Sequence, residues 1–235
     1  MRGEIISIIS EGVEDQGVIT TIFRAYGFDS TEIRAIRPGL AVDATDRHTN
    51  QQTIGTFQGV KNACLGNIDG IRPDFEKALL LENCNNIVIQ IDTAEIDRHD
   101  FLFVRPQKDG NVNYCAELRG LVIEKIDAWL DGCYKDNLLY AISIEEIEAW
   151  CLTAFEKRDT SLIANPKYLL SGHLDRNKLT YKKLKLNPMV HKKRYFEEVT
   201  KKMKFHKINK LKEYSEYNKS LKDFISSIEE KFPFE

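Results

Sequence analysis

The chain has 235 residues, of which 42 % are hydrophobic and 30 % are charged. This composition suits one globular domain with or without a small appendage, and it excludes a mostly disordered chain. No stretch approaches the roughly 20 apolar residues that a membrane-spanning helix needs. The five cysteines form no CxxC pair, which argues against a zinc site or a disulfide framework. We therefore expect a soluble cytoplasmic protein that does not enter membranes.

The net charge of -2 conceals an uneven distribution along the chain. Residues 1–175 carry 17 Lys and Arg against 28 Asp and Glu, whereas residues 176–222 carry 16 against 4. An acidic body followed by a basic stretch indicates an anionic partner near the C-terminal end. The alternatives are that the two parts attract each other or that the lysines form a solvated helix face.

Short apolar runs alternate along the first part of the chain with segments whose apolar residues recur at helical spacing. This alternation of strands and helices is typical of a parallel sheet with helices on both faces. The near-continuous apolar run at 86–92 is typical of a central parallel strand. In chain order, the expected elements are a strand at 4–10, a helix at 16–26, a strand at 33–36, helices at 55–65 and 75–81, a strand at 86–92, a helix at 117–130, a strand at 138–143 and a helix at 144–155.

Two segments do not follow this alternation. Residues 39–56 are polar and predict a long loop, whose acidic and histidine side chains we interpret as solvated. Residues 167–234 contain no clear strand and predict several helices. We therefore divide the chain into an α/β domain at 1–160 and a basic helical C-terminal extension at 161–235. The acidic and histidine residues of the loop are Asp43, Asp46 and His48.

Acidic residues follow three of the expected strands. Glu11 ends the first strand and Asp92 ends the central one, and a group of glutamates follows the strand at 138–143. Ligands bind at the carboxyl ends of the strands in open α/β sheets, so we expect these carboxylates to meet at one edge. The alternative, that such acids are favoured at helix N-termini by the helix dipole, is strongest for Asp15 and Glu145. The glutamates of the group are Glu145, Glu146 and Glu148.

Converging carboxylates repel one another unless a cation binds between them. Hard oxygen ligands of this kind suit Mg²⁺ or Mn²⁺ and not Zn²⁺. Such an ion can orient a phosphodiester, activate water and stabilise the leaving oxygen. The pattern of acids therefore predicts a metal site with phosphodiester chemistry.

Two of the strand ends resemble the motifs of Toprim domains, which occur in topoisomerases, primases and nucleases. The stretch Glu11-Gly-Val-Glu-Asp15 resembles the first motif of the family, and Ile87-Val-Ile-Gln-Ile-Asp92 resembles the strand that carries the first aspartate of the second motif. In that family the glutamate is a general acid or base and the aspartates hold Mg²⁺. The resemblance therefore implies an acid–base role for Glu11 and a metal-binding role for Asp92.

The chain departs from the Asp-x-Asp pattern of the second Toprim motif. Ala94 stands where the second aspartate is expected, so Glu95 or Asp97 would have to substitute for it. Further along, Glu148 precedes Trp150 as a glutamate precedes a core tryptophan in Toprim-like proteins of bacterial defence loci. This group is related to nucleases of the overcoming-lysogenisation-defect type, and the resemblance implies a Toprim- or Rossmann-like, mostly parallel sheet flanked by helices.

These observations favour a Mg²⁺- or Mn²⁺-dependent Toprim-like nuclease that cleaves DNA or RNA as an antiphage effector. The alternative is a non-catalytic, degenerate Toprim module that an ATPase or nuclease partner from the same defence locus recruits. The catalytic candidates are Glu11, Asp92 and Glu148, and the metal-binding candidates are Glu11, Asp15, Asp92, Glu95 and Glu148.

The basic C-terminal extension interleaves lysines with aromatic residues. Lysines contact phosphates and release counterions, whereas aromatic side chains either stack on unpaired bases or form the core of the helices. We interpret the aromatic residues Tyr195, Phe196 and Phe205 as core. The expected nucleic-acid contacts are Lys182, Lys183, Lys192, Lys193 and Arg194.

Overall fold

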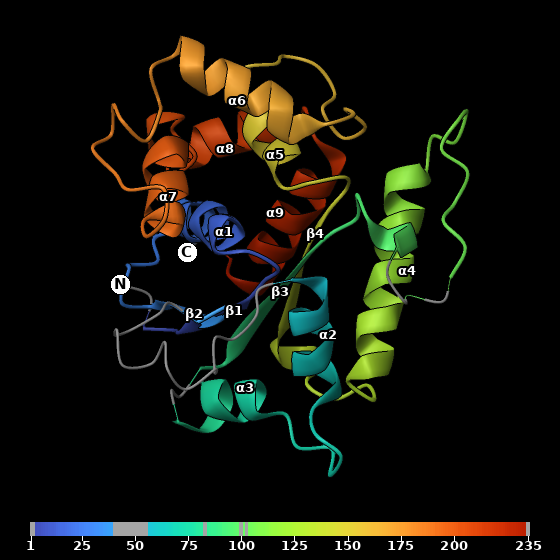
Figure 1. The fold of residues 1–235 in the computed structure, drawn as a ribbon. Helices are drawn as coiled ribbons and strands as arrows, with labels where there is room; N and C mark the ends of the chain where they lie inside the picture. Colours follow the sequence, from blue (N-terminus) through green and yellow to red (C-terminus); the bar gives the residue numbers. More distant parts are fainter. Residues whose placement is uncertain (1–2, 40–55, 82–83, 99–100, 102, 234–235) are drawn as a thin grey trace.

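The computed structural model describes residues 3–39, 56–81, 84–98, 101 and 103–233. Four strands form one sheet in the order β2-β1-β3-β4, and all neighbouring strands are parallel (Figure 1). The expected α/β fold is thereby confirmed. The strands are β1 (Ile6–Ile9), β2 (Ile33–Arg37), β3 (Asn86–Asp92) and β4 (Leu138–Ser143).

Helices cover both faces of the sheet. On one face lie α2 (Phe57–Leu65), α3 (Pro73–Glu76) and α4 (Tyr114–Trp129). On the side of the other face lie α1 (Val13–Ala25), α5 (Glu148–Leu152), α6 (Pro166–Arg176), α7 (Lys192–Lys202), α8 (Ile208–Ser215) and α9 (Lys219–Lys231). Residues 40–55, which hold Asp43, Asp46 and His48, lie outside the described residues.

The side chains of β3 alternate between two hydrophobic clusters. Val88 belongs to the cluster under α1, whereas Ile87, Ile89 and Ile91 belong to the cluster under α2 and α4. Because helices cover both faces, both sets of side chains are buried, which explains the near-continuous apolar run. Gln90 is the polar exception, and it is fully buried.

The C-terminal helices share a hydrophobic core with the sheet. The fully buried Trp150 donates a hydrogen bond from Nε1 to Ser220 Oγ (2.8 Å), and its ring stacks on Phe224 of α9 at 5.5 Å between centroids. One cluster contains residues from both of the segments that we divided at residue 160. The aromatic residues interpreted as core are buried, which confirms that interpretation: Tyr195, Phe196 and Phe205.

The helix expected at 144–155 is wrong in its first turn, because α5 starts only at Glu148. Glu145 has a left-handed backbone with φ of 63°. Its carbonyl accepts hydrogen bonds from Thr93 N and Ala94 N, both at 2.9 Å, and its own N–H donates to Thr93 Oγ1 at 3.0 Å. The chain that leaves β4 therefore pairs with the residues that follow β3 before it turns into a helix.

The close packing of α1 on α7 gives a prediction about Gly17. A Cβ at Gly17 would lie 2.5 Å from the carbonyl oxygen of Lys193, so Gly17→Ala forces the two helices apart. We predict that it lowers the free energy of unfolding by about 1–3 kcal/mol, measured by urea denaturation. The matched control is Gly172→Ala in α6, where nothing lies within 4 Å. That change should be neutral or stabilise by up to about 1 kcal/mol. Equal effects of the two changes would contradict this account.

Candidate active site

A cleft of about 280 Å³ opens at the carboxyl ends of β1 and β3. Among the described residues that line it, seven side chains are acidic and one, Lys167 of α6, is basic. Thr56 and Phe57, at the start of α2, also line the cleft. The acidic residues are Glu11, Glu14, Asp15, Asp92, Glu95, Glu146 and Glu148.

Gln90 fixes the two acids at the strand ends relative to each other. Its Oε1 accepts a hydrogen bond from Glu11 N (3.0 Å), and its Nε2 donates to Asp92 Oδ1 (2.8 Å). Asp92 N donates in turn to Glu11 Oε1 (2.9 Å). The two bonds of Glu11 join the end of β1 to the end of β3, and the bond from Gln90 to Asp92 holds the acid within β3. The sequence does contain a signal for this residue, since a polar side chain interrupts an apolar strand.

The first turns of α1 and α5 each add a buried acid to the cleft. Asp15 Oδ2 accepts a hydrogen bond from Gly12 N (2.7 Å), so this side chain caps α1 as the helix-dipole alternative expects. Glu148 begins α5. Both residues are buried, at 7 % and 5 % exposure, whereas Glu11 and Asp92 are half-buried. Asp15 therefore both caps its helix and faces the other carboxylates.

Burial and mutual repulsion raise the pKa values of these carboxyls. Burial raises the pKa of Glu11 to about 7, against the lowering effect of the Asp92 N–H. Burial also raises the pKa of Asp15 and of Asp92, and the neighbouring carboxylates raise both further. The pKa of Glu148 is raised by burial, while the Lys167 charge acts against that rise. The cleft thus concentrates negative charge that its described residues do not neutralise.

Lys167 is the one basic residue among the described residues that line the cleft. Its Nζ lies 3.6 Å from Glu148 Oε1, and that carboxylate raises the pKa of the lysine. The backbone N–H of Lys167 donates to Glu146 Oε2 at 3.4 Å. The sequence does not reveal that Lys167 lies beside Glu148, because the two residues belong to different helices whose packing depends on the tertiary fold.

Two acids considered from the sequence lie elsewhere. Glu145 pairs with Lys108 at 2.9 Å, and Asp97 pairs with Arg105 at 3.1 Å. Neither lines the cleft, whereas Glu95 does. Of the two residues that could replace the aspartate missing at Ala94, Glu95 is therefore the one in place. In the part of the chain that the structure describes, no three His, Cys, Asp or Glu side chains are arranged to hold one metal ion.

The five expected nucleic-acid contacts divide into two groups. Lys192 pairs with Glu14 at the cleft (3.3 Å), and Lys193 pairs with Glu197 (3.9 Å), so intramolecular attraction accounts for both. The other three are exposed to solvent. They are Lys182 and Lys183, between α6 and α7, and Arg194 in α7.

No protein-family model matches the chain, and the comparisons with curated proteins and with solved structures also found no match. Within the described segments, no helix is long and apolar enough to cross a membrane. The geometry and charge of the cleft are therefore the evidence for its function.

The raised pKa of Glu11 predicts a pH-dependent stability. The carboxyl has an ordinary value of 4.5 and titrates at about 7 in the folded protein. The folded state therefore binds more protons than the unfolded state between these values, and the free energy of unfolding falls as the pH rises through this window. In EDTA, Glu11→Gln should raise the free energy of unfolding at pH 8 by up to about 3 kcal/mol and change it little at pH 4.

The measurement is urea denaturation of wild type and variant at pH 4, 6 and 8. Glu230→Gln, which neutralises an exposed acid of α9, is the control and should change little at any of the three pH values. A gain from Glu11→Gln that is the same at pH 4 and pH 8 would contradict the raised pKa.

Proposed function

We propose that the chain is a divalent-metal-dependent nuclease that hydrolyses phosphodiester bonds in the acidic cleft. The observation that carries this proposal is the charge of the cleft, where seven acidic side chains face a single lysine among the described residues. Asp15 and Glu148 are buried within that group. Such an arrangement is unfavourable unless a cation or protons neutralise it, and perturbed carboxyls of this kind concentrate at functional sites.

The donor set suits Mg²⁺ or Mn²⁺, because carboxylate oxygens are the ligands that these hard ions prefer. Asp15, Asp92 and Glu148 would hold the ion, with Glu95 in place of the carboxylate that Ala94 lacks. The side chains must turn toward one another to do so. Mg²⁺ keeps several water ligands and needs only one or two carboxylates. When bound, the ion supplies positive charge for the phosphodiester and for the leaving oxygen.

Glu11 is suited to hold and release the proton of the reaction. A general acid or base is most effective when its pKa lies near the working pH, and the pKa of Glu11 is about 7. Its Oε1 accepts the hydrogen bond from Asp92 N, which fixes the carboxyl beside the proposed metal ligand. The residue is half-buried and lines the cleft, so a substrate can reach it.

One observation favours a second candidate function, a non-catalytic binding module. Ala94 stands at the position of the missing aspartate, and it and the preceding Thr93 form hydrogen bonds with Glu145. In this alternative the cleft binds a ligand without cleaving it, and an ATPase or nuclease partner recruits the chain. A role in antiphage defence depends, in either case, on the resemblance to Toprim-like proteins.

We expect the purified protein to cleave DNA or RNA oligonucleotides with Mg²⁺ or Mn²⁺ and not with EDTA. Glu11→Gln and Asp92→Asn should each lower the single-turnover rate by about 10²–10⁴-fold, the usual contribution of acid–base catalysis. Glu145→Gln is the matched control, since it removes an acid of the same region that pairs with Lys108 outside the cleft. The control should cleave at the wild-type rate.

Two outcomes of this experiment would count against the nuclease. Equal rates in the wild type and in both cleft variants would place the activity outside the cleft. Absence of cleavage with either metal, together with retained binding of the oligonucleotide, would favour the binding module.

A further inference from the structure

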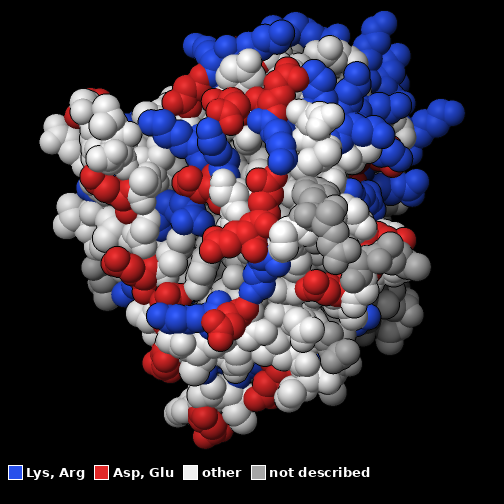
Figure 2. All heavy atoms as spheres, turned by 180° about the vertical axis from the view of Figure 1, so that it is seen from behind, with Lys and Arg blue, Asp and Glu red and all other residues white. Residues whose placement is uncertain are grey.

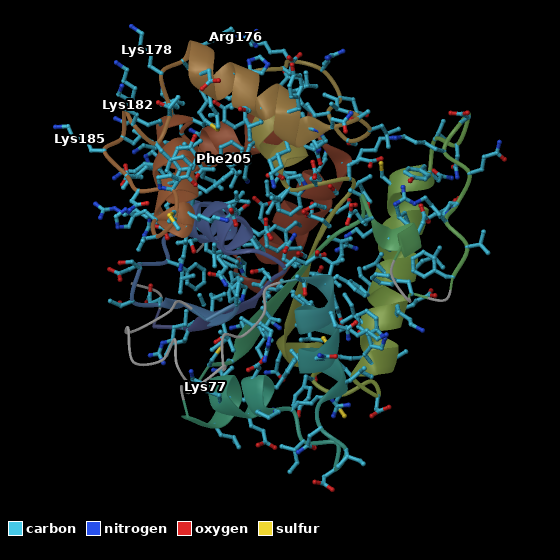
Figure 3. The ribbon with its side chains drawn as sticks, viewed as in Figure 1. Lys77, Arg176, Lys178, Lys182, Lys185 and Phe205 are labelled. Atoms are coloured by element: carbon cyan, nitrogen blue, oxygen red, sulfur yellow. The ribbon has the colours of Figure 1, made fainter. Side chains whose placement is uncertain are left out.

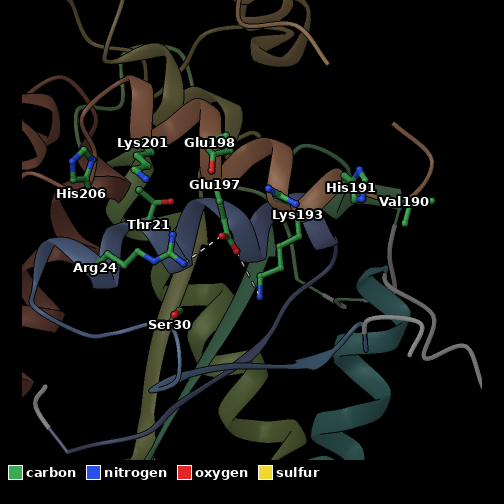
Figure 4. A pocket seen from close by; sticks show the side chains of 11 residues that line it. Thr21, Arg24, Ser30, Val190, His191, Lys193, Glu197, Glu198, Lys201 and His206 are labelled. Carbon is green, nitrogen blue, oxygen red and sulfur yellow. Dashed lines mark ion pairs between the residues drawn. The ribbon is translucent and has the colours of Figure 1, made fainter. Parts of the chain in front are cut away.

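A second hollow, of about 730 Å³, lies between α1 and α7 and shares no lining residue with the acidic cleft. Figure 4 shows Arg24 of α1 facing Lys193 and Glu197 of α7, with Lys201 and His206 toward one end. We call this hollow the α1–α7 groove. It has polar walls from two helices, as a binding site for a charged ligand requires.

Basic side chains outnumber acidic ones in the α1–α7 groove. Arg24 and Lys193 share the single carboxylate of Glu197, at 3.4 Å and 3.9 Å. Arg194 and Lys201 also line the groove and have no ion-pair partner among the described residues. Glu198 is the second acid of the groove, so four Lys and Arg side chains face two carboxylates among the described residues, and positive charge remains after the internal pairs are formed.

The positive charge continues beyond the groove. A neighbouring hollow of about 600 Å³ shares Glu198, Lys201 and His206 with it. Burial and the ammonium groups of Lys207 and Lys201 lower the pKa of His206, a sign of how closely the cations are crowded. The lysines that line the second hollow are Lys201, Lys202, Lys204, Lys207 and Lys210.

Figure 2 shows Lys and Arg side chains concentrated on one side of the molecule, next to a group of Asp and Glu in the middle of the same face. Figure 3 shows Lys178, Lys182 and Lys185 on the outer side of the segment between α6 and α7. The basic surface is therefore broad, and the two hollows are its concave part.

The parallel packing of α1 and α7 places one end of the α1–α7 groove near the acidic cleft. Gly17 faces Lys193, and Thr200 Oγ1 donates to Thr21 Oγ1 at 2.8 Å, so the residue numbers rise together along α1 and α7. At the first turns of both helices, Lys192 pairs with Glu14, which lines the cleft. The basic hollows therefore form a track that starts beside the cleft and runs away from it.

We propose that the α1–α7 groove binds the phosphate groups of a nucleic-acid strand whose neighbouring part lies in the acidic cleft. This inference rests on the proposed nuclease function, because the strand is the substrate of that reaction. Arginine and lysine side chains neutralise phosphates and release counterions. One arginine guanidinium can also donate two hydrogen bonds to two oxygens of the same phosphate. Two adjoining hollows with an excess of cations suit successive phosphates better than a single anion.

The test is the salt dependence of binding to a single-stranded oligonucleotide, measured by fluorescence anisotropy in EDTA so that no cleavage is needed. The groove variant is Arg24→Gln/Arg194→Gln/Lys201→Gln. The control is Arg176→Gln/Lys178→Gln/Lys185→Gln, which removes the same charge from exposed residues outside both hollows. Each lost phosphate contact lowers the slope of log K against log salt by about 0.7, so the groove variant should lose about 2.

An unchanged slope in the groove variant, or an equal loss in the control, would overturn the proposal. Circular dichroism verifies folding. If the triple variant unfolds, Arg194→Gln/Lys201→Gln, which changes two exposed residues of the groove, replaces it. Its slope should fall by about 1.4, from two contacts. Two competitors, each added at the same concentration of negative charge, would also overturn the proposal. Displacement of the oligonucleotide by adenosine monophosphate would show that the ligand is a free nucleotide. Displacement by polyglutamate would show that any polyanion binds.

The inference and the proposed function fail in different ways. Groove-dependent binding by a protein that never cleaves would refute the nuclease and leave the phosphate contacts in place. Cleavage that survives in the groove variant with the slope of the wild type would leave the nuclease in place and refute the groove.

Discussion

Repulsion among the carboxylates at the carboxyl ends of β1 and β3 is the constraint on which the rest of the site depends. The parallel register brings Glu11 and Asp92 to one edge, and the first turns of α1 and α5 add Asp15 and Glu148. Hydrogen bonds from Gln90 and from backbone N–H groups hold the acids in place, and they do not cancel the charge. Because these carboxyls are buried, water does not stabilise their charged form, and the pKa of each carboxyl is raised.

The C-terminal extension places positive charges beside these carboxylates, and its helices complete the hydrophobic core. Lys167 and Lys192 each place an ammonium beside an acid of the cleft, at Glu148 and Glu14. The sequence offers intramolecular attraction and binding of an anionic partner as alternatives for the basic stretch. In the structure these two roles are compatible because they involve different side chains. Within the basic stretch, Lys192 pairs with Glu14 of the cleft. Arg194 and Lys201 of the groove have no ion-pair partner among the described residues and remain available for a ligand.

Much of the sheet could be predicted from sequence because its strands are short apolar runs with helices on both sides. The runs at 86–92 and 138–143 coincide with β3 and β4. The expected meeting of acids at one edge follows from the same reasoning, since the carboxyl ends of parallel strands share an edge. Local pattern therefore determined the strands and the place of Glu11 and Asp92.

The remaining features depend on contacts between distant segments. The first turn of the expected helix at 144–155 is replaced by pairing of Glu145 with Thr93, which no local propensity reveals. Lys167 reaches the cleft through the packing of α6 on α5. The α1–α7 groove likewise requires two helices that are far apart in the chain, and a glycine at position 17 that allows their close approach.

The most direct test of the central claim, that the acidic cleft is a cation site, is anomalous diffraction from crystals soaked in Mn²⁺ at pH 8. At this pH the carboxyl of Glu11 is ionised, because its pKa is about 7. The account predicts an anomalous peak in the cleft, coordinated by Asp92 together with Asp15 or Glu148. An empty cleft at a Mn²⁺ concentration that saturates binding in solution, or a peak only elsewhere on the protein, would contradict it.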